Sequence, residues 1–96
     1  MSALSATAVP SCTYSYSVEE IKEHGRTVSF ALYKGVHTPP QSEYFFLEEE
    51  LVREEHAFQA YLRLRRRMEA IITRALIAGE VVTSVHDYSY YGRVMT

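Results

Sequence analysis

The longest regular pattern of apolar and polar positions runs from Ser42 to Gly79, a stretch without proline and with glycine only at its last position. Pro39 and Pro40 precede it, Ser42 can act as an N-cap, and Gly79 can take the left-handed conformation that ends many helices. Apolar residues recur inside it at three- and four-residue spacing, which is typical of an amphipathic helix. They are Tyr44, Leu47, Leu51, Phe58, Tyr61, Leu62, Leu64, Met68, Ile71, Ile72, Ala75 and Leu76. The pattern therefore predicts one long helix over this stretch.

The length of this helix allows two alternatives. At about 1.5 Å per residue it would span roughly 55 Å, whereas a compact chain of 96 residues has a radius of gyration of only about 12 Å. Either the helix breaks, most plausibly within the acidic segment Glu48–His56, or a second chain buries its excess length.

Charge is divided along the same stretch, because residues 43–55 carry six glutamates and one arginine, whereas residues 63–74 carry five arginines and one glutamate. This order suits the helix dipole, and it would also make an antiparallel second copy electrostatically complementary. In such a homodimer Glu54 and Arg65 would pair across a two-fold axis near Gln59. A local pair between Arg65 and Glu69, four residues apart, is the competing explanation.

Before the helix, Thr27–Tyr33 alternates as a strand, with Val28, Phe30 and Leu32 on one face. Alternation from Tyr14 to Val18 predicts a second strand, and a tight turn at His24-Gly25 would join the two into a hairpin.

Three further segments complete the prediction. The capping-box spacing of Ser17 and Glu20 leaves open a helical turn over Val18–His24. Residues 36–41 are predicted to form a stiff loop around the two prolines. Residues 80–95 alternate again and predict a C-terminal strand.

Together these elements predict an α+β fold: a small antiparallel sheet, made of the hairpin plus the C-terminal strand, packed on one long α-helix. Residues 13–96 form a single domain in this interpretation. Residues 1–12 are small and polar and predict a disordered N-terminal tail rather than a signal peptide.

The composition limits the classes of protein to which this chain can belong. With 47% apolar and 23% charged residues, the chain has the composition of an ordinary globular protein. No apolar run approaches the 18 or so residues of a membrane span, so we expect no membrane partner. The single cysteine, Cys12, cannot form an internal disulfide, which favours a reducing, cytoplasmic location.

No pattern of chemically reactive residues indicates an enzyme. The four histidines lie far apart without the spacing of a zinc site. The glycines are isolated, so no phosphate-binding loop is present. Consecutive glutamates on a helix point in different directions and are usually solvated. We therefore expect neither catalytic residues nor a metal or cofactor.

Tyrosines and arginines are the remaining concentrated features. Eight tyrosines without a tryptophan is a biased usage, and tyrosine is enriched in interfaces. Five arginines fall within residues 63–74.

The sequence thus predicts a non-enzymatic protein-interaction module, an adaptor, assembly factor or inhibitor of a larger complex, which binds another protein and forms a homodimer through the long helix. A nucleic-acid-binding protein using Arg63–Arg67 and the strand tyrosines is the alternative. The expected partner-binding residues are Glu54, Phe58, Tyr61, Arg65, Arg66, Tyr88 and Tyr90.

Overall fold

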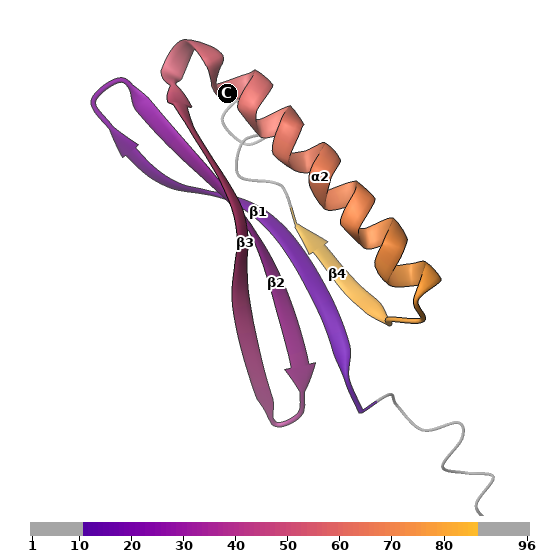
Figure 1. Cartoon of the computed structure of the whole chain (residues 1–96). Coiled ribbons are helices and arrows are strands. Elements are labelled where there is room, and N and C mark those ends of the chain that lie inside the picture. The colour runs from indigo at the N-terminus through magenta and orange to yellow at the C-terminus, as the bar shows by residue number, and fades with distance from the viewer. Residues whose placement is uncertain (1–10, 87–96) are drawn as a thin grey trace, which may run out of the picture.

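A computed structural model describes residues 11–86, with the backbone alone for residues 21–24 (Figure 1). The elements in order are β1 (Thr13–His24), β2 (Thr27–Thr38), β3 (Gln41–Arg53), the 3-10 turn η1 (Glu54–His56), α2 (Ala57–Ile77) and β4 (Val82–His86). The strands form one sheet in the order β3-β2-β1-β4, with α2 against one of its faces. The predicted α+β class is confirmed. Most pairs are antiparallel, but β4 runs parallel to β1.

The hairpin prediction for β1 and β2 is confirmed, and the helical alternative for Val18–His24 is wrong. His24 pairs with Thr27, and the turn consists of Gly25 and Arg26, one residue later than predicted. Gly25 has a φ of 64°, a conformation that glycine adopts without steric penalty. The hairpin also extends further than its alternation suggested, because β2 continues to Thr38.

The prediction of a helix from Ser42 onward is wrong. Residues 41–53 form strand β3, which pairs antiparallel with β2 along its whole length, and the helix begins only at Ala57. The predicted loop over residues 36–41 shrinks accordingly to Pro39 and Pro40, joined by a cis peptide bond. The anticipated break of a helix within Glu48–His56 does not occur, because β3 ends in this segment and η1 leads directly into α2. Residues 41–53 form a strand because pairing with β2, a contact between separate elements, overrides the helix propensity of the glutamates.

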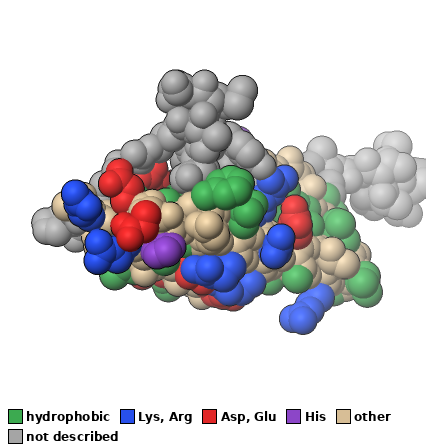
Figure 2. Space-filling model, turned by 90° about the horizontal axis from the view of Figure 1, so that it is seen from above, with side chains coloured by type: hydrophobic (Ala, Val, Ile, Leu, Met, Phe, Trp, Pro, Cys, Tyr) green, Lys and Arg blue, Asp and Glu red, His purple; other side chains and the backbone are tan. Residues whose placement is uncertain are grey.

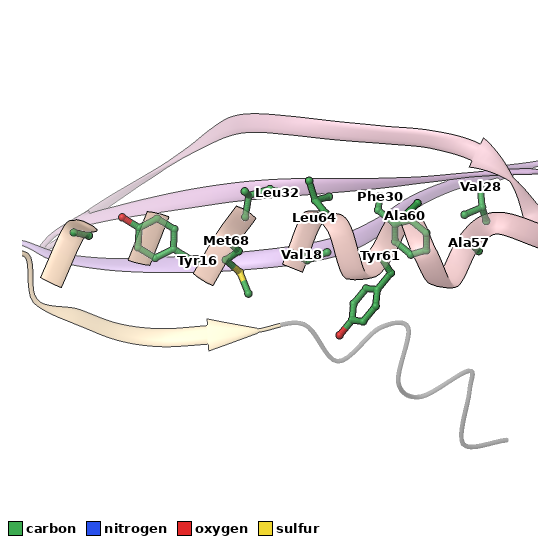
Figure 3. Close-up of a cluster of buried hydrophobic side chains, with 11 residues drawn as sticks. Tyr16, Val18, Val28, Phe30, Leu32, Ala57, Ala60, Tyr61, Leu64 and Met68 are labelled. Carbon is green, nitrogen blue, oxygen red and sulfur yellow. The ribbon is translucent and has the colours of Figure 1, made fainter. Parts of the chain in front are cut away.

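The core lies between the sheet and α2, as Figure 3 shows. The predicted face of β2 is confirmed, because Val28, Phe30 and Leu32 are all buried. The Phe30 ring packs on the ring of Tyr61 from α2, with centroids 6.0 Å apart. The other side chains of this cluster come from β1 and from one face of the helix: Tyr16, Val18, Ala57, Ala60, Leu64, Met68 and Ala75. The predicted apolar stripe is therefore confirmed from Tyr61 to Ala75, whereas Phe58 and Leu76, which the prediction included, are exposed.

The end of the helix fixes the start of β4. Gly79 has a φ of 92°, as predicted for the residue that ends the helix, and its N–H donates to the carbonyl of Leu76. The next residue, Glu80, accepts hydrogen bonds from the Tyr16 hydroxyl and from Lys34 Nζ, at 3.0 and 3.3 Å. These contacts hold the segment between α2 and β4 over β1 and β2. As a result, β4 begins next to β1.

Two predicted segments lie outside the described residues. They are the N-terminal tail up to Pro10 and the C-terminal strand beyond His86. No helix within residues 11–86 combines the length and the apolar character that a membrane span requires.

Candidate functional site

The acidic and basic segments seen in the sequence meet within one chain. β3 and α2 run in opposite directions, so that Arg63 donates to Glu50 at 3.0 Å and Arg67 pairs with both Glu48 and Glu50. These hydrogen bonds from Arg63 and Arg67 hold the pKa of Glu50 below its usual range. The charge complementarity from which we predicted a homodimer is thus used between strand and helix of the same molecule.

Much of the arginine cluster is ion-paired within the chain. Besides Arg63 and Arg67, Arg65 lies 3.4 Å from Glu69 on the next helical turn, the local pair that was the competing explanation. Figure 2 accordingly shows acidic side chains lying among the basic ones rather than a separate basic patch. A surface of this kind offers little net attraction for a phosphate backbone.

The structure does not bring the predicted partner-binding residues onto one surface. Tyr61 is 1% exposed and belongs to the core, whereas Phe58, three residues earlier on α2, is 45% exposed. Glu54 is exposed in η1, and Arg66 is exposed on the helix. Tyr88 and Tyr90 lie outside the described residues.

The surface that sequence reasoning missed is the face of the sheet opposite α2, which we call the open face. Figure 1 shows α2 along one face of the sheet, and no other element of residues 11–86 covers the opposite one. Cross-strand register places Ser15, Ser17 and Glu19 of β1 on it, next to Gly35, Tyr33 and Ala31 of β2. The residues of β3 on this face are Ser42, Tyr44, Phe46, Glu49 and Leu51.

Exposed apolar side chains concentrate on β3. Four consecutive residues, Tyr44, Phe45, Phe46 and Leu47, are 67%, 46%, 54% and 36% exposed. We call these four residues the aromatic row. A register shift opposite Leu32 and Tyr33 makes Leu47 the extra residue of the strand, so the row presents side chains to both faces of the sheet edge. The signal in the sequence is the run YFFL, which begins four residues after Pro40. The predicted long helix included this run.

A hydrogen-bonded histidine organises one end of the open face. His37 Nε2 lies 2.8 Å from Ser15 Oγ, and His37 Nδ1 lies 2.8 Å from Ser42 Oγ. The Tyr44 ring meets the imidazole edge to face, with centroids 5.6 Å apart. Gly35 makes this arrangement possible. A Cβ there would lie 2.8 Å from His37 Nε2 and 3.0 Å from Tyr44 Cε1, and closer still to Ser15 Oγ.

The chemistry of this serine–histidine arrangement is limited by its place in the sheet. Neutral imidazole donates through one nitrogen and accepts through the other, so one serine hydroxyl donates to His37 and the other accepts from it. Acyl transfer would also require free N–H donors to stabilise an oxyanion. Around Ser15 and His37, β2 is paired with β1 and β3, and β1 is paired with β2 and, from Tyr14 to Ser17, with β4, which commits their amides to the ladders. Among the described residues, no three His, Cys, Asp or Glu side chains gather as a metal site would require.

Small residues on the central strands leave two hollows in the open face. The larger has a volume of about 460 Å³, with Ser15 and Ser17 among its lining residues and Glu19, His37, Tyr44 and His86 around them. The smaller, of about 270 Å³, is lined by Ser17, Glu19, Tyr33 and Tyr44. The larger hollow falls within the range of ligand sites, about 300–1,000 Å³, and the smaller just below it.

Lys34 of β2 belongs to the face opposite these hollows. Lys34 Nζ lies 4.8 Å from the centroid of the Tyr14 ring and 3.3 Å from Glu80 Oε2. Partial burial by itself lowers the pKa of Lys34, but hydrogen bonding to Glu80 and the neighbouring Tyr16 raise it overall. Burial and the hydrogen bond to Glu80 raise the pKa of Tyr16. Lys34 is therefore directed toward the helix side, where it pairs with Glu80 rather than with Glu19 on the open face.

Comparison with protein-family models, with curated proteins and with solved structures finds no match for this chain.

Proposed function

We propose that this protein is a non-enzymatic interaction module that binds an extended segment of another protein along strand β3. The observation that supports this proposal is the aromatic row, Tyr44–Leu47, on an edge strand. Large exposed apolar patches on small proteins commonly mark interaction sites. Aromatic residues are also the side chains that contribute most to protein interfaces.

The position of β3 determines how the segment binds. Among the described strands β3 has a neighbour on one side only, β2. Its other side presents backbone N–H and C=O groups, which can pair with an added strand. The added strand would lie beside the aromatic row, whose side chains would contact it from both faces of the sheet.

Charge indicates the chemistry of the partner. β3 carries four glutamates, of which Glu48 and Glu50 are ion-paired with α2. Glu43 and Glu49 remain to attract a partner, and Glu19 adds a carboxylate on the open face. A basic segment would be attracted to this edge, whereas a second copy would bring two acidic strands together. We therefore favour another protein over the homodimer through the helix that the sequence suggested. The nucleic-acid alternative is weaker as well, because Arg63, Arg65 and Arg67 are ion-paired within the chain.

A reducing, cytosolic location belongs to the same proposal. The lone Cys12 has no cysteine in the chain with which to form a disulfide, as is usual for cytosolic proteins.

The test is a selection of displayed random peptides on the full chain, followed by amide hydrogen exchange of the complex. We expect the selected peptides to carry net positive charge and to slow exchange along β3. The substitution Phe46→Ser should weaken their binding at least tenfold. Leu51→Ser is the matched control, because Leu51 lies on the same strand and face and is 67% exposed, against 54% for Phe46, but is outside the aromatic row; it should change affinity less than threefold.

Three results would overturn the proposal. Peptides that protect α2 instead of β3 would move the site to the helix. Sedimentation showing a dimer that Phe46→Ser dissociates would make the occupant of this edge a second copy. Binding to single-stranded DNA that falls steeply with salt would favour the nucleic-acid alternative.

A further inference from the structure

We propose that the smaller hollow of the open face is a subsite for a cationic side chain, specifically the guanidinium of an arginine in the bound segment. The inference rests on the proposed function, because it names a side chain that the segment would supply. The site consists of Tyr33, Tyr44, Ser17 and Glu19, the four residues that line the hollow of about 270 Å³.

The register of the sheet brings these residues together. Tyr33 of β2 is flanked by Ser17 of β1 on one side and by Phe46 of β3 on the other. The Phe46 ring meets Tyr33 edge to face, with centroids 6.1 Å apart and an interplanar angle of 75°. This contact supports one side of Tyr33, while the small Ser17 leaves the other side open. The hollow is therefore preformed around an aromatic ring.

Glu19 gives the hollow its charge. It lies two residues after Ser17 on the same face of β1, and its side chain is exposed. No cation within the described side chains forms an ion pair with it, and Lys34 is held by Glu80 on the opposite face. A carboxylate beside tyrosine rings favours a cation over an anion, because both the carboxylate and the ring faces are negative.

The residues that line the hollow favour an arginine over a small metal ion or a lysine. A guanidinium is planar, so it can stack on a tyrosine ring while it donates two parallel hydrogen bonds to one carboxylate. Ser17 supplies a further hydroxyl acceptor at the same wall. The volume suits one long side chain rather than a cofactor, which needs a larger cavity.

The experiment uses the full chain and two small probes, N-acetylargininamide and its neutral isostere N-acetylcitrullinamide, titrated by NMR. We expect the arginine probe to shift the ring resonances of Tyr33 and Tyr44 with millimolar affinity. The citrulline probe should bind at least fivefold more weakly. Glu19→Gln should weaken the arginine probe about tenfold, the effect of losing one charge-assisted contact.

Glu43→Gln is the matched control, since it removes the same charge from an exposed glutamate that does not line this hollow; it should change affinity less than twofold. Tyr33→Leu keeps an apolar side chain but removes the ring, and it should also weaken the arginine probe. Equal binding of both probes, or equal effects of Glu19→Gln and Glu43→Gln, would overturn the subsite.

The failure of the subsite can be distinguished from the failure of the proposed function. Peptides that bind along β3 while neither probe binds would refute the subsite alone. Specific binding of the arginine probe without any peptide that protects β3 would refute the interaction module and leave the subsite standing.

Discussion

Gly35→Ala should destabilise this protein, although replacing glycine by alanine within an ordinary strand stabilises a protein. Glycine inside a strand costs roughly 0.5–1 kcal/mol relative to alanine, because it loses more backbone freedom on folding. At Gly35 the added methyl group would collide with His37 Nε2 and Tyr44 Cε1, at 2.8 and 3.0 Å, and more severely with Ser15 Oγ. Overpacking of this kind costs about 1–3 kcal/mol, and loss of the Ser15–His37 hydrogen bond adds about 0.5–1.5 kcal/mol.

We therefore expect a net loss of about 1–3 kcal/mol from these terms. In a domain of this size each kcal/mol lowers Tm by about 4–8 °C. Urea unfolding followed by circular dichroism measures the free energy, and thermal unfolding checks its sign. A Gly35→Ala protein as stable as the parent, or more stable, would refute the close approach of the three side chains to Gly35.

A double-mutant cycle identifies the atom responsible. Ser15→Ala removes Oγ, the atom nearest to the added methyl group, so Gly35→Ala should cost at least 0.5 kcal/mol less in the Ser15→Ala background than in the parent. Ser17→Ala is the matched control, because Ser17 lies on the same face of β1 but pairs with Tyr33 rather than Gly35. Its combination with Gly35→Ala should be additive within about 0.5 kcal/mol.

Three other substitutions test the core and the ion pairs. Phe30→Ala should cost about 3–5 kcal/mol, whereas Tyr33→Ala on the open face should be milder; equal urea midpoints would contradict the register of β2. The folded pKa of Glu50 is lowered, so its contribution to stability is complete well above the ordinary glutamate pKa of about 4.3 and is lost as the pH falls toward the folded value. Glu50→Gln should flatten this acid dependence in urea titrations from pH 3 to 7, and an unchanged profile would show that its two arginine contacts contribute little. Arg65→Glu removes the surface pair with Glu69, so it should change stability by less than about 1 kcal/mol; a change in sedimentation behaviour would instead revive the helix dimer.

Local patterns in the sequence predicted the parts of the fold that depend on local physics. The alternation around Phe30 identified the central strand and its buried face. Gly25 marked the hairpin, and Gly79 marked the end of the helix, because both positions require a backbone conformation that few other residues adopt. The apolar spacing from Tyr61 to Ala75 identified the face of α2 that packs on the sheet.

Strand β3 could not be identified in the same way. Its glutamates favour a helix when considered alone, and Tyr44, Leu47 and Leu51 happen to recur at helical spacing. What makes this segment a strand is its pairing with β2 and the ion pairs of Glu48 and Glu50 with the helix, which are contacts between separate elements.

The candidate site depended on the same missing information. Tyrosine usage correctly drew attention to aromatic surfaces, but the residues that sequence reasoning singled out lie on α2, in η1 or beyond His86. The open face exists only once β3 is placed beside β2. His37 then lies between Ser15 and Ser42, and Gly35 lies beneath Tyr44. No spacing within a single segment predicts an arrangement that joins three strands.

The parallel pairing of β1 with β4 has a consequence for how the chain folds. β1 and β2 form a hairpin, β3 adds next to it, and α2 follows β3 through a short turn, so each of these steps joins neighbours in sequence. The contact of Tyr14 with Val82 joins nearly the first and the last described residues, and contacts of this separation form slowly because a long loop must close first. During synthesis on the ribosome, β1 therefore waits with one edge unpaired until α2 has emerged and Glu80 has docked. A nascent chain is open to strand addition at β1 during this interval, on the side of the sheet that β4 later occupies.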